Sequence, residues 1–240
     1  LTMATKKKAL QAAAGQAGGE ALYVEDVFST YLYEGNGSTQ TITNDIDLDG
    51  EGGMVWAKQR TGAASSNVLV DTERGVNAVI YSDVTNAEYS SGTNTLTAFN
   101  SNGYDLGSNN NFNKSGEDYA SWTFRKAPKF FDVVTYTGDG TGGRDISHNL
   151  GSTPGCIIVR NIDTAANWIV KHKSLVGVSE APFLLLNGTN AQLENNAYGD
   201  SSLDSSTSFN VGSNLNASSN NYVAYLFAHN DDDGEFGESG

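Results

Sequence analysis

"YASWTFRKAP", residues 119–128, returns in altered form as "YVAYLFAHND", residues 222–231. Tyr119 lies 103 residues before Tyr222, and the two stretches are aligned on this pair. "YASWTF" alternates large and small side chains, which is typical of a β-strand with one buried face. Each stretch is therefore predicted to be the last strand of one repeated unit.

Other segments repeat at the same spacing, in the same order. The further pairs are Phe124 with Phe227, "YEGNG" (33–37) with "YTGDG" (136–140), and "MVW" (54–56) set over "IIV" (157–159). Similarity at one fixed offset indicates that a structural unit has been repeated.

The repeat divides the chain into four predicted segments. They are an N-terminal docking arm (1–20), a first unit (21–128), a second unit (129–231) and an acidic linker or tail (232–240). Within the first unit, short runs rich in β-branched and aromatic residues are separated by Gly, Asn and Asp. This pattern predicts an all-β chain of two tandem β-sandwich or jelly-roll-like domains.

Local signals refine this prediction at two places. "SNGY" (101–104) predicts a hairpin, because Asn-Gly suits the positive φ angles of tight turns. "TKKKALQAAA" (5–14) has high helix propensity, so the arm is expected to be helical when it meets a partner.

Composition excludes several functional classes. The net charge of −14 argues against a protein that binds nucleic-acid phosphates. The single cysteine, Cys156, lies in an apolar run and rules out an internal disulfide and any cysteine-based metal site. No run approaches the ~18 apolar residues of a membrane span, so no membrane insertion is expected.

One acidic loop is a candidate metal site. Asp45, Asp47 and Asp49, followed by Gly50, match the first half of a calcium-binding loop. The position that should supply a bidentate carboxylate is Trp56. An exposed acidic loop is the favoured interpretation, and a calcium site is the alternative.

Neither a catalytic nor a cofactor motif stands out. The three histidines are scattered, no G-x-S-x-G elbow occurs, and the Gly-rich "GDGTGG" (138–143) is followed by no helical pattern. We therefore expect no enzyme and no cofactor. Aromatic residues at repeat-equivalent sites, such as Tyr33 and Tyr136, are expected to be core residues. Trp168 and Tyr198 have no clear counterparts in the other unit, which makes them weak candidates for stacking on a sugar.

Longer stretches carry a family resemblance. They are "GGMVWAKQRTGAASSNVLVDTERG" (52–75), "LTAFNSNGYDLGS" (96–108), "YASWTFRKAPKFFDVVTYTGDGTGGRDISHNLGSTPGCIIVR" (119–160) and "NYVAYLFAH" (221–229). Together they resemble a repeated domain of tailed phages, common in marine and cyanobacterial phages, over about residues 21–230. The resemblance implies tandem β-domains of tail-fibre-like and other virion structural proteins, in a family with no catalytic motif to transfer.

The expected function follows from this resemblance. We expect a virion structural protein, a tail fibre or tail appendage whose arm attaches it to other tail proteins, with the two sandwiches as a rigid stalk. The resemblance also implies a homotrimer and a chain that continues beyond residue 240. The alternatives are a module that binds host-surface glycans and a capsid decoration protein. The residues expected to bind the partner are Lys6, Lys7, Lys8, Leu10, Tyr23 and Phe28.

Overall fold

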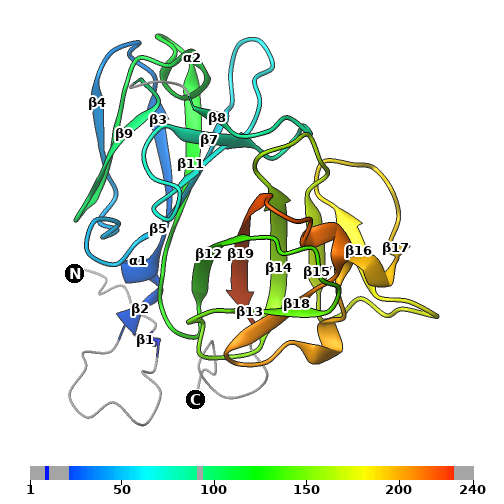
Figure 1. Cartoon of the computed structure of the whole chain (residues 1–240). Helices are drawn as coiled ribbons and strands as arrows, with labels where there is room; N and C mark the ends of the chain where they lie inside the picture. Colours follow the sequence, from blue (N-terminus) through cyan, green and yellow to red (C-terminus); the bar gives the residue numbers. More distant parts are fainter. Residues whose placement is uncertain (1–8, 11–21, 91–93, 230–240) are drawn as a thin grey trace.

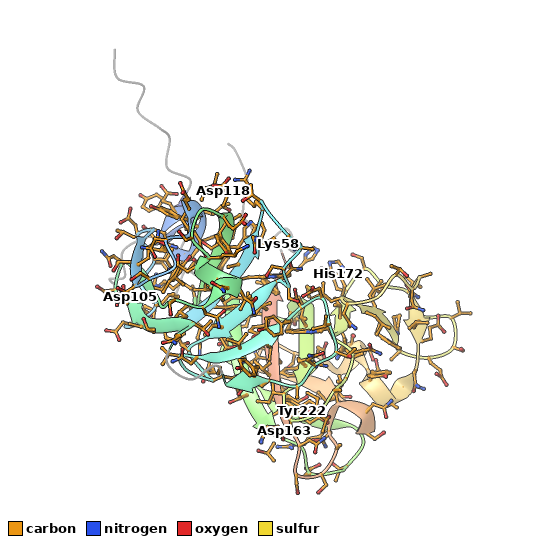
Figure 2. The ribbon with its side chains drawn as sticks, turned by 90° about the horizontal axis from the view of Figure 1, so that it is seen from above. Lys58, Asp105, Asp118, Asp163, His172 and Tyr222 are labelled. Atoms are coloured by element: carbon orange, nitrogen blue, oxygen red, sulfur yellow. The ribbon has the colours of Figure 1, made fainter. Side chains whose placement is uncertain are left out.

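The protein is seen here in a computed structural model, which describes residues 9–10, 22–90 and 94–229. Nearly all of its regular structure is antiparallel β-sheet, so the predicted all-β class is confirmed. The two halves of the chain lie side by side, and each is built on a six-stranded sheet (Figure 1; from above, Figure 2).

The first half pairs its strands in the order β3-β11-β5-β6-β7-β8, and a three-stranded sheet, β4-β10-β9, forms its second layer. The predicted hairpin is present, since β9 ends at Asn100 and β10 begins at Gly103. The elements up to β11 are β1 (Ala9–Leu10), β2 (Leu22–Tyr23), α1 (Val24–Val27), β3 (Phe28–Glu34), β4 (Gln40–Thr43), β5 (Gly53–Gln59), β6 (Val68–Asp71), β7 (Ala78–Tyr81), β8 (Tyr89–Ser90), β9 (Leu96–Asn100), β10 (Gly103–Leu106), α2 (Asn110–Asn113) and β11 (Asp118–Arg125).

The second half repeats this order as β12-β19-β14-β15-β16-β17, with a two-stranded sheet, β13-β18, as its second layer. Its elements are β12 (Phe131–Thr137), β13 (Arg144–Ser147), β14 (Pro154–Asn161), β15 (Ile169–His172), β16 (Pro182–Leu185), β17 (Leu193–Glu194), three 3-10 turns η1 (Asn196–Tyr198), η2 (Ser201–Leu203) and η3 (Ser213–Leu215), β18 (Ser208–Val211) and β19 (Asn221–Ala228).

Strand pairing corrects one of the sequence alignments. Val55 lies opposite Thr123 on β11, and Ile157 lies opposite Leu226 on β19. Thr123 and Leu226 are 103 residues apart, so Ile157 corresponds to Val55 and not to Met54. The offset at β14 is one residue smaller than predicted, and a slip of one residue moves a side chain to the other face of a sheet.

Each half has its own buried core between its two layers. In the first half, Val55 and Ala57 on β5 face Ile42 and Tyr104 of the smaller sheet. In the second half, Ile157 and Val159 on β14 belong to the same cluster as Phe209 of β18. Alternate residues of β5 and β14 point away from these cores, as period-2 strands require.

A pair of stacked tyrosines occurs in both halves at the predicted equivalent positions. The rings of Tyr33 and Tyr119 are 5.1 Å apart and nearly parallel, and those of Tyr136 and Tyr222 are 5.0 Å apart. In each pair the first tyrosine donates its hydroxyl hydrogen to a backbone carbonyl, at 2.8 Å in the first half and 2.7 Å in the second. The prediction that these repeated aromatics are core residues is confirmed.

A fully buried asparagine lies next to each tyrosine pair. Asn113 and Asn216 each donate from the side-chain amide to the loop that follows the first strand of their half. Each also accepts a backbone N–H from that loop, from Asn36 at 2.8 Å and Asp139 at 3.2 Å. Because equivalent asparagines make equivalent hydrogen bonds in the two halves, these contacts support the repeat.

The two halves are joined by a third buried cluster. It contains Met54 and Leu69 from the first half with Ile158, Val223 and Tyr225 from the second. All of these residues point away from the cores of their own halves. The two six-stranded sheets therefore pack against each other through their outer faces, and the halves share one continuous buried layer.

The described ends of the chain meet at one end of the molecule (Figure 1). Val27 of α1 packs on Ala127 in the junction between the halves, and Leu22 and Phe130 join the same cluster. Ala228, at the end of β19, donates its N–H to the Phe130 carbonyl at 3.0 Å. The segments before and after the body thus leave from neighbouring points.

The predicted helical arm is only partly within the described residues. Ala9–Leu10 form strand β1, which pairs antiparallel with β2 in the chain alone. The helix expected when the arm meets a partner stays a prediction. The other residues of the arm, and the acidic tail from 232, lie outside the described residues. Within the part of the chain that the structure describes, no helix has the length and apolar character needed to cross a lipid bilayer.

Candidate functional site

The predicted partner-binding residues fall into two groups. Lys6, Lys7 and Lys8 lie outside the described residues. Leu10 pairs with Leu22 in the small β1–β2 sheet. Phe28 packs on Phe124 with ring centroids 4.9 Å apart and the rings tilted by 47°, and it is half-buried within the chain.

Tyr23 is also engaged within the chain. Its backbone N–H donates to the Asp26 side chain at 2.7 Å and so caps the short helix α1. The ring is half-buried. Tyr23 and Phe28 therefore hold the entry segment on the body, and any partner contact they make must use the exposed remainder of each ring.

The acidic triplet is spread along the loop between β4 and β5. Asp45 and Asp49 are exposed, and the residues between the three aspartates are buried in the core of the first half. Asp47 already accepts the Gly50 N–H at 2.8 Å. Among residues 9–10, 22–90 and 94–229, no group of three or more His, Cys, Asp or Glu is arranged to hold a metal ion.

Trp168, a candidate for stacking on a sugar, is not an exposed platform. Its side chain is 0% exposed, and its indole N–H donates to the Tyr81 carbonyl of the other half at 2.8 Å. The Arg160 guanidinium lies over its ring, 5.7 Å from the centroid. Trp168 lacks a counterpart because it fills the layer between the halves. Tyr198 is half-buried against Phe183, with centroids 4.3 Å apart.

A buried charge cluster crosses the same layer. Arg74 donates from Nε to Asp71 at 2.7 Å and from Nη1 to Glu88 at 2.8 Å. Tyr225 of the second half donates its hydroxyl hydrogen to Asp71 at 2.7 Å. Burial lowers the pKa of Arg74, but the effects of Asp71, Tyr225 and Glu88 together outweigh it, so the net pKa is raised and the guanidinium stays charged.

The second half also contains a cavity of about 330 Å³. Its walls come from the start of β14, the end of β15, and the segment that includes η2. Charged groups of both signs line it, among them Lys171, Lys173, Asp200 and Asp204. Figure 2 labels His172, the last residue of β15, which lies between the two lysines in the sequence and also lines the cavity.

Lys171 and Asp204 form a buried pair in the cavity wall. The Lys171 Nζ lies 3.2 Å from the Asp204 Oδ1, and their side chains are 2% and 4% exposed. Burial lowers the pKa of Lys171, whereas it raises the pKa of Asp204 against the opposing effect of Lys171. Both groups are thus shifted towards their neutral forms.

The main chain of Asn210 binds both members of this pair. Its carbonyl accepts a hydrogen bond from Lys171 Nζ at 2.9 Å, and its N–H donates to Asp204 Oδ1 at 2.8 Å. Sequence reasoning missed the pair because nothing in "VKHKS" (170–174) indicates an acidic partner. The available signal was the spacing of Ile169 and Lys171, which places them on the same face of β15.

Comparison with protein-family models gave one match. A model described as a domain of unknown function (DUF7483) matches residues 24–238. Comparison with curated proteins gave no match, and comparison with solved structures gave none either. Since the matched region includes both halves and nearly the whole chain, the chain belongs to the DUF7483 family.

Proposed function

We propose that the chain is a non-enzymatic structural protein of a phage virion, and that it forms part of a tail appendage. The resemblance described above supports the phage assignment. The observation that carries the structural role is the buried layer between the halves, with its Arg74 cluster. Domains joined by a small polar interface usually move relative to each other, whereas a large apolar interface holds them as one body.

The position of the chain ends changes how the two halves are expected to be arranged in the appendage. Because the chain enters and leaves at one end of the body, the two halves would project from their point of attachment and would not lengthen a fibre in series. The arm, residues 1–20, is the proposed attachment to the tail. Lys6, Lys7 and Lys8 would meet an acidic partner surface, since opposite charges steer association. A homotrimer remains part of the proposal.

The first test is to locate the protein by immunogold electron microscopy of purified virus particles. Label at the tail is the expected result. Label over the head would replace the proposal by capsid decoration. If particles carry no label at all, the virion assignment is overturned.

A second test separates attachment from folding. Removing residues 1–20, or changing Lys6, Lys7 and Lys8 to alanine, should abolish incorporation into particles while leaving the circular dichroism of the β body unchanged. A matched control removes the same charge elsewhere, by changing Lys58, Lys114 and Lys173 to alanine. If the control and the arm variant lose incorporation equally, the arm is not the attachment site.

Glycan binding is the competing function, and the burial of Trp168 removes one of the two residues on which it was based. A glycan array probed with the full chain tests it directly. Reproducible binding there, together with unlabelled particles, would favour the binding module over the structural protein.

A further inference from the structure

The buried pair of Lys171 and Asp204 stands where the other half has an apolar residue. Ile157 on β14 lies opposite Lys171, and the corresponding Val55 on β5 lies opposite Val70. Val70 is fully buried in the core of the first half. A buried ion pair usually gains less from mutual attraction than it loses in desolvation, so an apolar pair at the same site would be at least as stable. The stability of an ion pair therefore does not explain why a lysine is buried at this position.

Asn210 arranges the two groups for a reaction between them. Its N–H donates to Asp204 Oδ1 and so polarises the carboxyl group, as a donor in an oxyanion hole does. Its carbonyl accepts from Lys171 Nζ and so fixes the direction of the amine. One residue of β18 thus holds a nucleophile and an electrophile together, in a site from which most water is excluded.

We propose that Lys171 and Asp204 form an intramolecular isopeptide bond. In this step the Nζ–Cγ bond forms and the bond from Cγ to Oδ2 breaks. One amine proton joins the departing Oδ2 hydroxyl, and a single water molecule leaves. Starting from the neutral amine and the neutral acid, atoms and charge balance without an oxidant, a reductant or any other reactant.

The surroundings suit each stage of this reaction. The neutral amine is the nucleophilic form, and the neutral acid can lose a hydroxyl group as water; burial shifts both groups in that direction. Asp200 lines the same cavity, and hydrogen bonds from Ser202 lower its pKa, so it stays ionised beside the pair. The cavity gives the released water a path out.

The product would also satisfy every polar group that it creates. Its amide N–H would keep the hydrogen bond to the Asn210 carbonyl, and its C=O would keep the one from the Asn210 N–H. The buried charges would disappear. The bond would close a covalent loop between β15 and the segment before β18, which restricts the unfolded chain as a disulfide does.

The test is intact-mass spectrometry of the purified full chain, fresh and after prolonged incubation under native conditions. The expected mass is lower than that of the sequence by one water molecule. Proteolysis should release a branched peptide that joins the segments containing Lys171 and Asp204. The variants Lys171→Met and Asp204→Ala should have their full masses, a readout that does not require them to fold well. Lys173→Met, which changes an exposed lysine on the same segment, should still lack one water.

Two outcomes would overturn the proposal. One is a native chain that keeps its full mass after incubation. The other is a loss of water that persists in Lys171→Met, because that would place the loss elsewhere, for example in a succinimide at an Asp-Gly sequence.

Discussion

Replacing Arg74 by methionine should lower the free energy of unfolding by about 3–5 kcal/mol, because it leaves a buried carboxylate without its cation. Asp71 is fully buried, and two of its partners remain in the variant. They are the backbone N–H of residue 74 at 3.0 Å and the Tyr225 hydroxyl at 2.7 Å. Neither carries a charge, so most of the desolvation cost of Asp71 would be uncompensated. Methionine fills part of the volume of the arginine stem, which keeps the loss from packing small.

A double variant, Asp71→Asn combined with Arg74→Met, tests whether the uncompensated charge of Asp71 causes this loss. Asparagine removes the negative charge and keeps an acceptor for Tyr225, so the double variant should recover about 2 kcal/mol relative to Arg74→Met. The control is Lys114→Met. Its ion pair with Glu117 is 3.1 Å long, but the lysine side chain is 44% exposed, so the expected loss is at most about 1 kcal/mol.

The assay is urea unfolding followed by tryptophan fluorescence, which reports on Trp168 in the same buried layer. Two results would refute the reasoning. One is a loss below about 1 kcal/mol in Arg74→Met, which would mean that Asp71 is solvated or protonated at little cost. The other is a double variant that is less stable than the single one.

Three further predictions test other parts of the structure. His148 is buried, which lowers its pKa against the pull of nearby acids, and its Nδ1 accepts the Leu150 N–H at 3.1 Å. The unfolded chain therefore binds the proton at a higher pH than the folded chain does, and the free energy of unfolding should fall as the pH drops below about 6.5. Asn44 occupies the equivalent position in the first half, so His148→Asn should weaken this pH dependence in urea titrations. Burial raises the pKa of Cys156 to about 11, so iodoacetamide should alkylate the native chain at pH 8 at least about a hundredfold more slowly than the chain in urea, and equal rates would contradict this. Residues 129–231 expressed alone would expose the outer face of their sheet, and size-exclusion chromatography should show association or aggregation, whereas a stable monomer would contradict the shared layer.

The sequence was most informative where local signals and the repeat agreed. "SNGY" gave the hairpin between β9 and β10, and the repeated tyrosines gave core positions in both halves. These features depend on near neighbours in the chain or on one constant offset. The alignment of "MVW" over "IIV" failed because the loops between strands differ in length, and a single-residue slip is invisible in an apolar run.

The candidate site depended on information that no local pattern carries. Trp168 was misplaced because an aromatic residue on an outer sheet face is exposed in an isolated sandwich, and only the packing of the second half against the first buries it. Lys171 was missed for a related reason. Asp204 lies in the loop before β18 and Asn210 on β18 itself, both far along the chain, so their approach to β15 follows from tertiary structure alone.

The shared layer has a consequence for how many units can join. Both halves contribute the same face of the same six-stranded sheet to it. An association in which the partners present identical faces to each other closes on itself, whereas one between unlike faces can extend without limit. The described body has used both copies of this face, so a third unit would find no vacant one. Association through this sheet face therefore stops at two units. A longer array of such units would have to be built from pairs, joined through some other surface.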